Sequence, residues 1–191
     1  MFTTKSGLPL IITNLDKLRI NKMGINAQQL HDHIVKPTLE YMRGNYYSRD
    51  AAFLMLCTAA IESNCGEYLK QVNGPALGIW QMEPDTHDDI WENCDACYTE
   101  TGQLIVGLSS HNSFNGCDDF LAARNLIDSP KYACAMARLK YAMDSDPLPC
   151  RSNLRAVYGY YKRIYNTEAG ASTWAKFKQA VLHHKILEVE L

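Results

Sequence analysis

SRDAAFLMLCTAAIESNCGEYLKQVNGPALGIWQMEP, residues 48–84, is the stretch of this 191-residue chain that decides its fold. From Ala51 to Ile61 nearly every side chain is apolar or small, and the Ser48 hydroxyl can cap the first turn of a helix. A helix that is apolar on all sides must be surrounded by other elements. The stretch therefore predicts a buried central helix against which the rest of the chain packs.

A single acid, Glu62, stands at the end of this apolar run. One interpretation is a solvated acid at a helix terminus. The other is a partly buried carboxyl group, because the preceding residues place this turn in the core and Ser63 and Asn64 can orient the side chain. Burial disfavours the charged form and raises the pKa of a carboxyl group, which makes it a general acid near neutral pH. We favour the second interpretation.

The loop after this helix contains three glycines and then an aromatic–amide–acid cluster formed by Trp80, Gln81 and Glu83. Core packing alone would explain Trp80 and Met82. A glycan cleft uses the same residue types, since a flat aromatic ring stacks on a sugar face while amide and carboxylate groups bind hydroxyls. Directly after a candidate acid, this loop is predicted to line such a cleft.

The remaining sequence indicates helices separated by turns that contain Gly, Pro or Asn. With the central helix, the predicted helices are residues 26–42, 48–63, 84–94, 99–110, 118–127, 129–144, 152–166 and 172–187. The sequence leaves the structure of an N-terminal arm, residues 1–25, undefined. We predict a mainly α protein of seven or eight helices with little β structure, in a single domain over residues 1–191.

Composition limits the partners. The net charge of −2 gives no case for a nucleic-acid-binding protein. No stretch approaches the roughly 18–20 apolar residues of a membrane span, and the N-terminus lacks the apolar core of a secretory signal, so we expect synthesis in the cytoplasm without membrane insertion. Lys and Arg are absent from Gln71 to Ala123 and frequent from Arg124 onward. That basic half could approach an anionic polymer, although ordinary solvated faces explain the pattern as well.

Seven cysteines raise the question of a metal or redox site. Cys94 and Cys97 form a CxxC pair, which occurs in zinc and redox sites. No second CxxC is present, and further ligands would have to come from Cys65, His87, His111 or Cys117. We therefore predict no metal ion and no cofactor, and keep a zinc-stapled helical interaction module as a weaker alternative.

Two motifs carry a family resemblance. Glu62-Ser63, followed by Gly78-Ile79-Trp80-Gln81-Met82, resembles the Glu-Ser and Gly-Leu-Met-Gln motifs of the soluble lytic transglycosylases and goose-type lysozymes. The longer string GPALGIWQMEP, with THDDIW after it, is similar to a group of phage-encoded lysozyme-like proteins that includes endolysins. The resemblance covers residues 48–91. It extends more weakly to YYKRIYNTEAG, residues 160–170, which would correspond to the family's third motif, a helix that brings a tyrosine to the cleft.

The resemblance implies a lysozyme-like α-rich domain with the glycan strand of peptidoglycan as substrate. Glu62 would protonate the glycosidic oxygen between N-acetylmuramic acid and N-acetylglucosamine. The residues expected to hold the substrate or the acid are Ser63, Gly78, Trp80, Gln81 and one or more of Tyr158, Tyr161 and Tyr165. Two departures stand out: Trp80 replaces the usual Met, and Ile164 precedes Tyr165 where the family has Ala.

A second carboxylate would decide the reaction. A hydrolase needs a base or a nucleophile near the acid, whereas in a lytic transglycosylase the substrate's own 6-hydroxyl attacks and one acid suffices. The candidates for this second group are Glu67, Glu83, Asp85 and Asp88, each of which could equally be a helix-terminal surface acid. We favour Glu83, and with it hydrolysis.

The sequence thus predicts a monomeric, bacteriolytic lysozyme-type muramidase, a phage endolysin or virion-associated lysin. It would be made in the host cytoplasm and act on the cell wall in the periplasm after release. A lytic transglycosylase that gives 1,6-anhydro products is the first alternative. A non-catalytic wall-binding or virion structural protein is the second, and an intact Glu62 and Gln81 argue against it.

Overall fold

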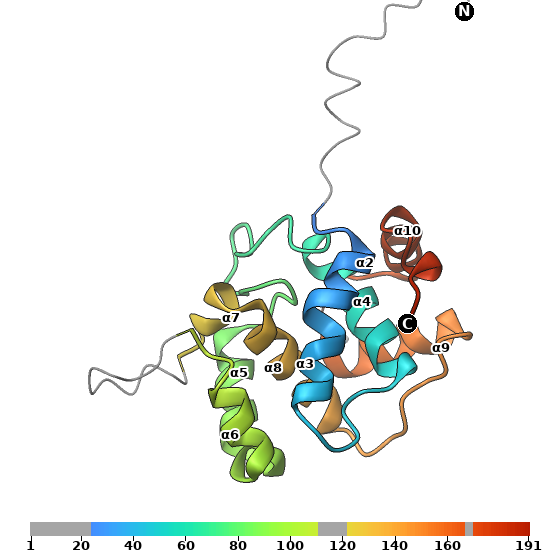
Figure 1. Cartoon of the computed structure of the whole chain (residues 1–191). Coiled ribbons are helices and arrows are strands. Elements are labelled where there is room, and N and C mark those ends of the chain that lie inside the picture. Colours follow the sequence, from blue (N-terminus) through green and yellow to red (C-terminus); the bar gives the residue numbers. More distant parts are fainter. Residues whose placement is uncertain (1–23, 111–121, 167–169) are drawn as a thin grey trace, which may run out of the picture.

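The computed structural model of the chain describes residues 24–110, 122–166 and 170–191 (Figure 1). Almost all of the predicted N-terminal arm and part of the predicted helix 118–127 lie outside these residues. The described part is mainly helical and contains no sheet, which confirms the predicted fold class. Its only β pairing consists of isolated antiparallel bridges, in which Leu77 pairs with both Lys70 and Met82.

The helical elements share one core. In chain order they are α2 (Ala27–Leu30), the π-helical turn η1 (His31–Val35), α3 (Lys36–Tyr41), α4 (Arg49–Ser63), α5 (Pro84–Asn93), the 3-10 turn η2 (Asp95–Tyr98), α6 (Glu100–Val106), α7 (Asn125–Asp128), α8 (Pro130–Ala142), α9 (Leu154–Tyr161), the π-helical turn η4 (Lys162–Asn166), α10 (Trp174–His183) and the 3-10 turn η5 (Ile186–Glu188). Buried apolar side chains from most of them form a single cluster.

Helix α4 lies at the centre of this cluster, as predicted. Every residue from Ala51 to Ala60 is buried, and α4 contacts η1, α8, α9 and α10, which surround it in Figure 1. The Ser48 hydroxyl accepts a hydrogen bond from the Ala51 amide at 3.0 Å, which caps the first turn. Asn64 ends the helix in a left-handed conformation with φ 57°. The end of α4 is therefore fixed by its own sequence.

The loop between α4 and α5 is fastened to α4 by two buried polar side chains. The Ser63 hydroxyl lies 2.5 Å from the Ile79 carbonyl oxygen and accepts a hydrogen bond from the Gly66 amide at 2.8 Å. The Trp80 indole nitrogen donates to the Met55 carbonyl oxygen at 3.0 Å, in the middle of α4. These bonds hold the loop against the second half of the central helix.

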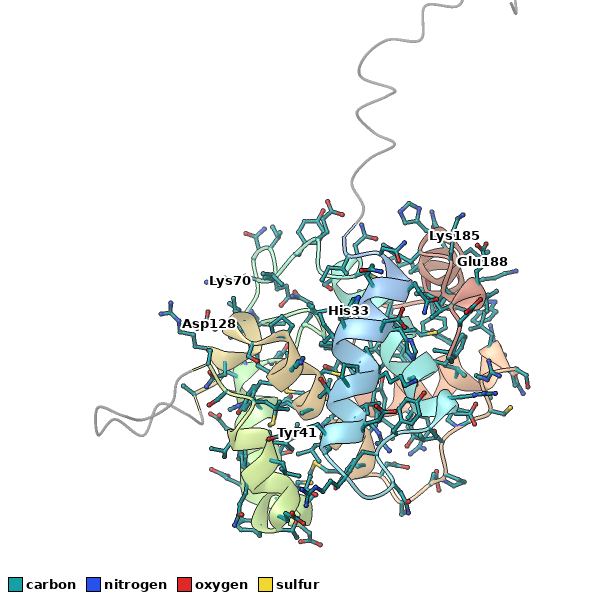
Figure 2. All side chains as sticks on the ribbon, viewed as in Figure 1. His33, Tyr41, Lys70, Asp128, Lys185 and Glu188 are labelled. Carbon is teal, nitrogen blue, oxygen red and sulfur yellow. The ribbon has the colours of Figure 1, made fainter. Side chains whose placement is uncertain are left out.

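The C-terminal segment closes on the same helix end. His184 is buried just after α10, and its Nε2 lies 2.6 Å from the Asn64 amide oxygen. Lys185 and Glu188 lie together beyond the end of α10, with 3.7 Å between ammonium and carboxylate (Figure 2). Among the described residues, every helix is too short or too polar to cross a membrane.

Gly78 allows the loop to approach α7. Its φ is +75°, and a Cβ at this position would lie 2.2 Å from the Leu126 carbonyl oxygen. The Gly78→Ala variant is therefore expected to lose about 2–4 kcal/mol of unfolding free energy, through left-handed strain and the clash. Urea denaturation followed by circular dichroism measures this loss.

Gly159 provides the matched control for that substitution. It lies in α9, and an alanine Cβ there would meet no atom within 4 Å apart from its chain neighbours and the backbone of its own helix. Gly159→Ala is therefore expected to stabilise the protein by about 0.5–1 kcal/mol through helix propensity. Equal stabilities for Gly78→Ala and the wild type would show that the loop does not need its close contact with α7.

Candidate active site

Glu62 lies in the last turn of α4 and lines a hollow of about 470 Å³. Residues of several other regions complete the wall of the hollow. Among these regions are the loop before α5, with Gln81 and Glu83, the η4 turn, with Tyr165 and Asn166, and the start of α10. The end of the most buried helix thus presents a carboxyl group to an open, mostly polar hollow. This is the arrangement predicted for Glu62.

The environment of Glu62 favours its protonated form. Burial raises the pKa of the carboxyl group above its usual range. Three neighbours oppose this rise, namely hydrogen bonds with Tyr161 and Asn166 and the positive charge of Lys162. The Tyr161 hydroxyl donates to Glu62 Oε1 at 2.6 Å. Burial thus shifts Glu62 toward its protonated form, and the Tyr161 hydroxyl sets the orientation of the carboxyl group.

Tyr165 joins the two sides of the hollow. Its hydroxyl donates to the Trp80 carbonyl oxygen at 2.9 Å, and its ring stacks on Tyr141 with 5.3 Å between ring centroids. Tyr141 in turn shares a 2.7 Å hydrogen bond with Thr58, one turn before Glu62 in α4. Tyr161 and Tyr165 lie four residues apart on one helical face, and both line the hollow. The structure thus selects these two tyrosines among the three predicted.

Gln81 and Glu83 form the opposite wall. Gln81 adopts a left-handed backbone with φ 45°, which is uncommon for a residue other than glycine. Its side-chain amide donates to the Gly78 carbonyl oxygen at 2.7 Å, which fixes the turn. Glu83 is exposed at the N-cap position of α5, and its side chain makes no capping hydrogen bond. Its carboxylate is therefore available to the hollow.

Four predicted substrate-binding residues lie elsewhere. Trp80 is 1% exposed with its indole in the core, so the prediction that this ring lines the cleft is wrong. Ser63 is fully buried, and Gly78 packs against α7, so both hold the loop and present no side chain to a ligand. Tyr158 packs among Trp174 and Phe177 behind the hollow.

Of the four acids considered as the second carboxylate, Glu83 lines the hollow with Glu62. Glu67 accepts a hydrogen bond from the Asn64 amide, Asp88 bonds the ring of His87 at 2.8 Å, and Asp85 lies in the first turn of α5. None of these three is part of the hollow's lining. The position of Glu83 thus fits the role predicted for it.

Sequence reasoning did not assign a role to Asn166, Lys140 or Lys176, which also line the hollow. Asn166 accepts a hydrogen bond from the Lys162 ammonium at 2.8 Å, and Lys162 also donates to the Gly170 carbonyl oxygen at 2.7 Å. The position of Asn166 directly after Tyr165, a predicted cleft residue, could have marked Asn166 as a cleft residue too. The lysines come from α8 and α10, far away in sequence, and no local pattern marks them.

A second hollow of about 450 Å³ adjoins the first one. Both are lined by Ile61, Glu62 and Lys176, and the second extends past Asn64 and Tyr68 to His183. Glu62 therefore lies where the two hollows meet. A polymer could occupy both, with the carboxyl group near the middle of the bound segment.

Within the described residues, no three His, Cys, Asp or Glu side chains gather in a way that could hold a metal ion. Cys94, at the end of α5, and Cys97, in η2, are free thiols. Two of the ligands considered with them, His111 and Cys117, lie outside the described residues. Burial raises the pKa of Cys97 to about 12, so this thiol stays protonated and weakly nucleophilic at neutral pH.

The pH dependence of any reaction that needs protonated Glu62 should respond to Tyr161. Activity is lost as pH rises through the pKa of Glu62, because the acid form is consumed. Tyr161→Phe removes a hydrogen bond that lowers this pKa, so the alkaline limb of kcat/KM is expected to move to higher pH. The maximal kcat/KM of this variant should fall because the carboxyl group loses the donor that orients it.

Tyr158→Phe is the matched control, since the Tyr158 hydroxyl lies 3.5 Å from the Ser172 carbonyl oxygen and outside the hollow. Its alkaline limb should coincide with that of the wild type. If the alkaline limb moves to lower pH in Tyr161→Phe, or moves equally in both variants, the hydrogen bond from Tyr161 does not lower the pKa of Glu62.

No protein-family model, no curated protein and no solved structure matches the chain significantly.

Proposed function

We propose that this protein is a glycosidase that cleaves the β-1,4 bond between N-acetylmuramic acid and N-acetylglucosamine in peptidoglycan, a lysozyme-type muramidase. One observation carries the proposal. Glu62 is a carboxyl group with a raised pKa, held by the Tyr161 hydroxyl at 2.6 Å, at the meeting point of two adjoining hollows. An acid that keeps its proton beside a groove suits protonation of a glycosidic oxygen.

In the proposed reaction, Glu62 donates its proton to the glycosidic oxygen as the bond from C1 to that oxygen breaks. The sugar develops an oxocarbenium-like charge at C1. Glu83, across the same hollow, removes a proton from a water molecule that attacks C1. Tyr161 and Asn166 hold the Glu62 carboxyl group during this step, and Tyr165 fixes the wall at Trp80.

A lytic transglycosylase is the second candidate. The observation that favours it is that two residues, Tyr161 and Asn166, hold the Glu62 carboxyl group. A single acid held in this way can first donate a proton and then accept one from the substrate's 6-hydroxyl. That hydroxyl attacks C1 of the same sugar and closes a 1,6-anhydro ring. The two candidates share the substrate and Glu62 and differ in the role of Glu83.

Mass spectrometry of digested, purified peptidoglycan tests the proposal. Fragments that end in a reducing muramic acid mean hydrolysis, and fragments that end in a 1,6-anhydro sugar mean transglycosylation. A sample from which the pure protein releases no glycan fragment would contradict both candidates. It would favour a non-catalytic wall-binding protein.

The biological role follows from the reaction. A cell-wall glycosidase with the motifs of residues 48–91 fits a bacteriophage endolysin or virion-associated lysin that acts as a monomer. Made in the host cytoplasm, it would reach peptidoglycan in the periplasm after release. The outcome for the host is bacteriolysis, which is also the basis of antimicrobial use.

A further inference from the structure

Two lysines contribute positive charge to the hollow that contains Glu62. Lys140 comes from the last turn of α8, and Lys176 comes from the first turn of α10. Lys176 also lines the second hollow, so it lies beside the junction at Glu62. Both side chains line concave surface, where charges are less screened by solvent than on a flat face.

These two ammonium groups have no acidic partner among the described residues. The Lys176 ammonium donates to the neutral Ala171 carbonyl oxygen at 3.3 Å. Some other cations form ion pairs: Arg124 with Asp128, Arg163 with Asp144 and Asp146, and Lys185 with Glu188. What distinguishes Lys140 and Lys176 from other unpaired lysines is their place in the groove that is proposed to bind a polymer.

The acids of the hollow do not cancel this charge. Two ammonium groups face two carboxyl groups, Glu62 and Glu83, and burial of Glu62 opposes its charged form. A neutral glycan such as chitin offers these groups only hydroxyl and acetamido oxygens. Peptidoglycan differs, because every muramic acid carries a lactyl ether, and the peptide attached to it ends in free carboxylates.

We propose that Lys140 and Lys176 form a subsite for the carboxylates that peptidoglycan carries on its muramic acid substituents. The inference rests on the proposed function and deepens it, since it makes the groove selective for substituted, anionic glycan. Ammonium–carboxylate hydrogen bonds are stronger than neutral ones, so they add affinity that a bare glycan cannot obtain.

The test compares two forms of one substrate. Solubilised peptidoglycan strands are used as isolated, or after their carboxyl groups have been converted to amides with a carbodiimide and ammonia. Wild-type protein is expected to show about tenfold higher kcat/KM on the native strands than on the amidated ones, as expected for one or two charge-assisted bonds. In Lys140→Met/Lys176→Met this ratio should fall to about 1, and Lys140→Arg/Lys176→Arg should restore most of it.

Lys131→Met and Lys178→Met are matched controls on the same two helices, outside the hollow with Glu62, and both should keep the wild-type ratio. The subsite is overturned if the wild type cleaves both strands equally well, or if the double Met variant keeps the wild-type preference. If the wild type releases fragments from neither strand, the proposed function itself fails. That result is distinct from the loss of a preference in an active enzyme.

Discussion

Glu62→Gln is expected to cleave peptidoglycan about 10²- to 10⁴-fold more slowly than the wild type, the range that general acid catalysis supplies. Glutamine keeps the size and an acceptor oxygen for the Tyr161 hydroxyl, but it has no proton to donate to the leaving oxygen. The measurement is the initial rate of turbidity loss of outer-membrane-permeabilised cells, together with fragment release from purified peptidoglycan. Since every proposed reaction starts with proton donation by Glu62, both assays should fall together.

The stability of Glu62→Gln provides the control for folding. A carboxyl group with a folded-state pKa above its usual value of 4.5 binds its proton more tightly in the folded protein. The stability that this proton contributes is complete below the usual pKa and is lost as pH rises through the raised one. At pH 8 the variant, which has no charge to bury, should unfold at a temperature equal to or above that of the wild type.

Retained lysis by Glu62→Gln would remove this residue from the mechanism and with it the main support for a glycosidase. A variant that unfolds much earlier at pH 8 than the wild type would instead indicate that Glu62 has a structural role as a charged group. Thermal unfolding followed by circular dichroism distinguishes these results from the expected one.

The sequence was sufficient for α4 and Glu62 because their signals are local. Eleven nearly unbroken apolar or small residues can only form a central helix, and Ser48 and Asn64 mark its two ends. The first acid after such a run must lie at the edge of the core. The family resemblance pointed to Tyr158, Tyr161 and Tyr165, but it could not decide which of these hydroxyls reaches Glu62.

The loop was harder to predict because it lacks regular periodicity. Trp80 and Gln81 are neighbours whose side chains point in different directions. The indole lies in the core and bonds to the Met55 carbonyl oxygen, whereas the Gln81 side chain lines the hollow. This choice depends on the left-handed turn at Gln81 and on the approach of Gly78 to Leu126, which is a tertiary contact. The lysines of the hollow depend on how α8 and α10 pack, which no local pattern encodes.

The position of Glu83 is fixed by a buried polar network in α5. Tyr132 accepts a hydrogen bond from the Trp91 indole at 2.9 Å, and its hydroxyl lies 2.8 Å from His87 Nε2. His87 is fully buried one turn after Glu83, and its amide donates to the Glu83 carbonyl oxygen at 3.0 Å. The start of α5, and the backbone of Glu83 with it, is therefore anchored to α8. Such anchoring suits the water-activating role proposed for Glu83.

Glu83→Gln is expected to lower the rate of hydrolysis about 10²-fold or more, because the amide cannot remove a proton from the attacking water. Its cost in stability should stay below about 1 kcal/mol, since Glu83 makes no capping hydrogen bond and contributes only a favourable charge at the N-terminus of α5. Rates and products are read together, by fragment release and mass spectrometry. Asp85→Asn, in the first turn of the same helix but outside the hollow, should keep the wild-type rate.

The products decide what an unexpected result means. If Glu83→Gln retains activity and both it and the wild type release 1,6-anhydro sugars, Glu62 alone carries the reaction and the protein is a transglycosylase. If the variant retains activity and both release reducing muramic acid, water is activated without Glu83, and the hydrolase needs another base. If Glu83→Gln loses activity and the wild type releases reducing muramic acid, the result supports a hydrolase in which Glu62 is the acid and Glu83, in the same hollow, is the base.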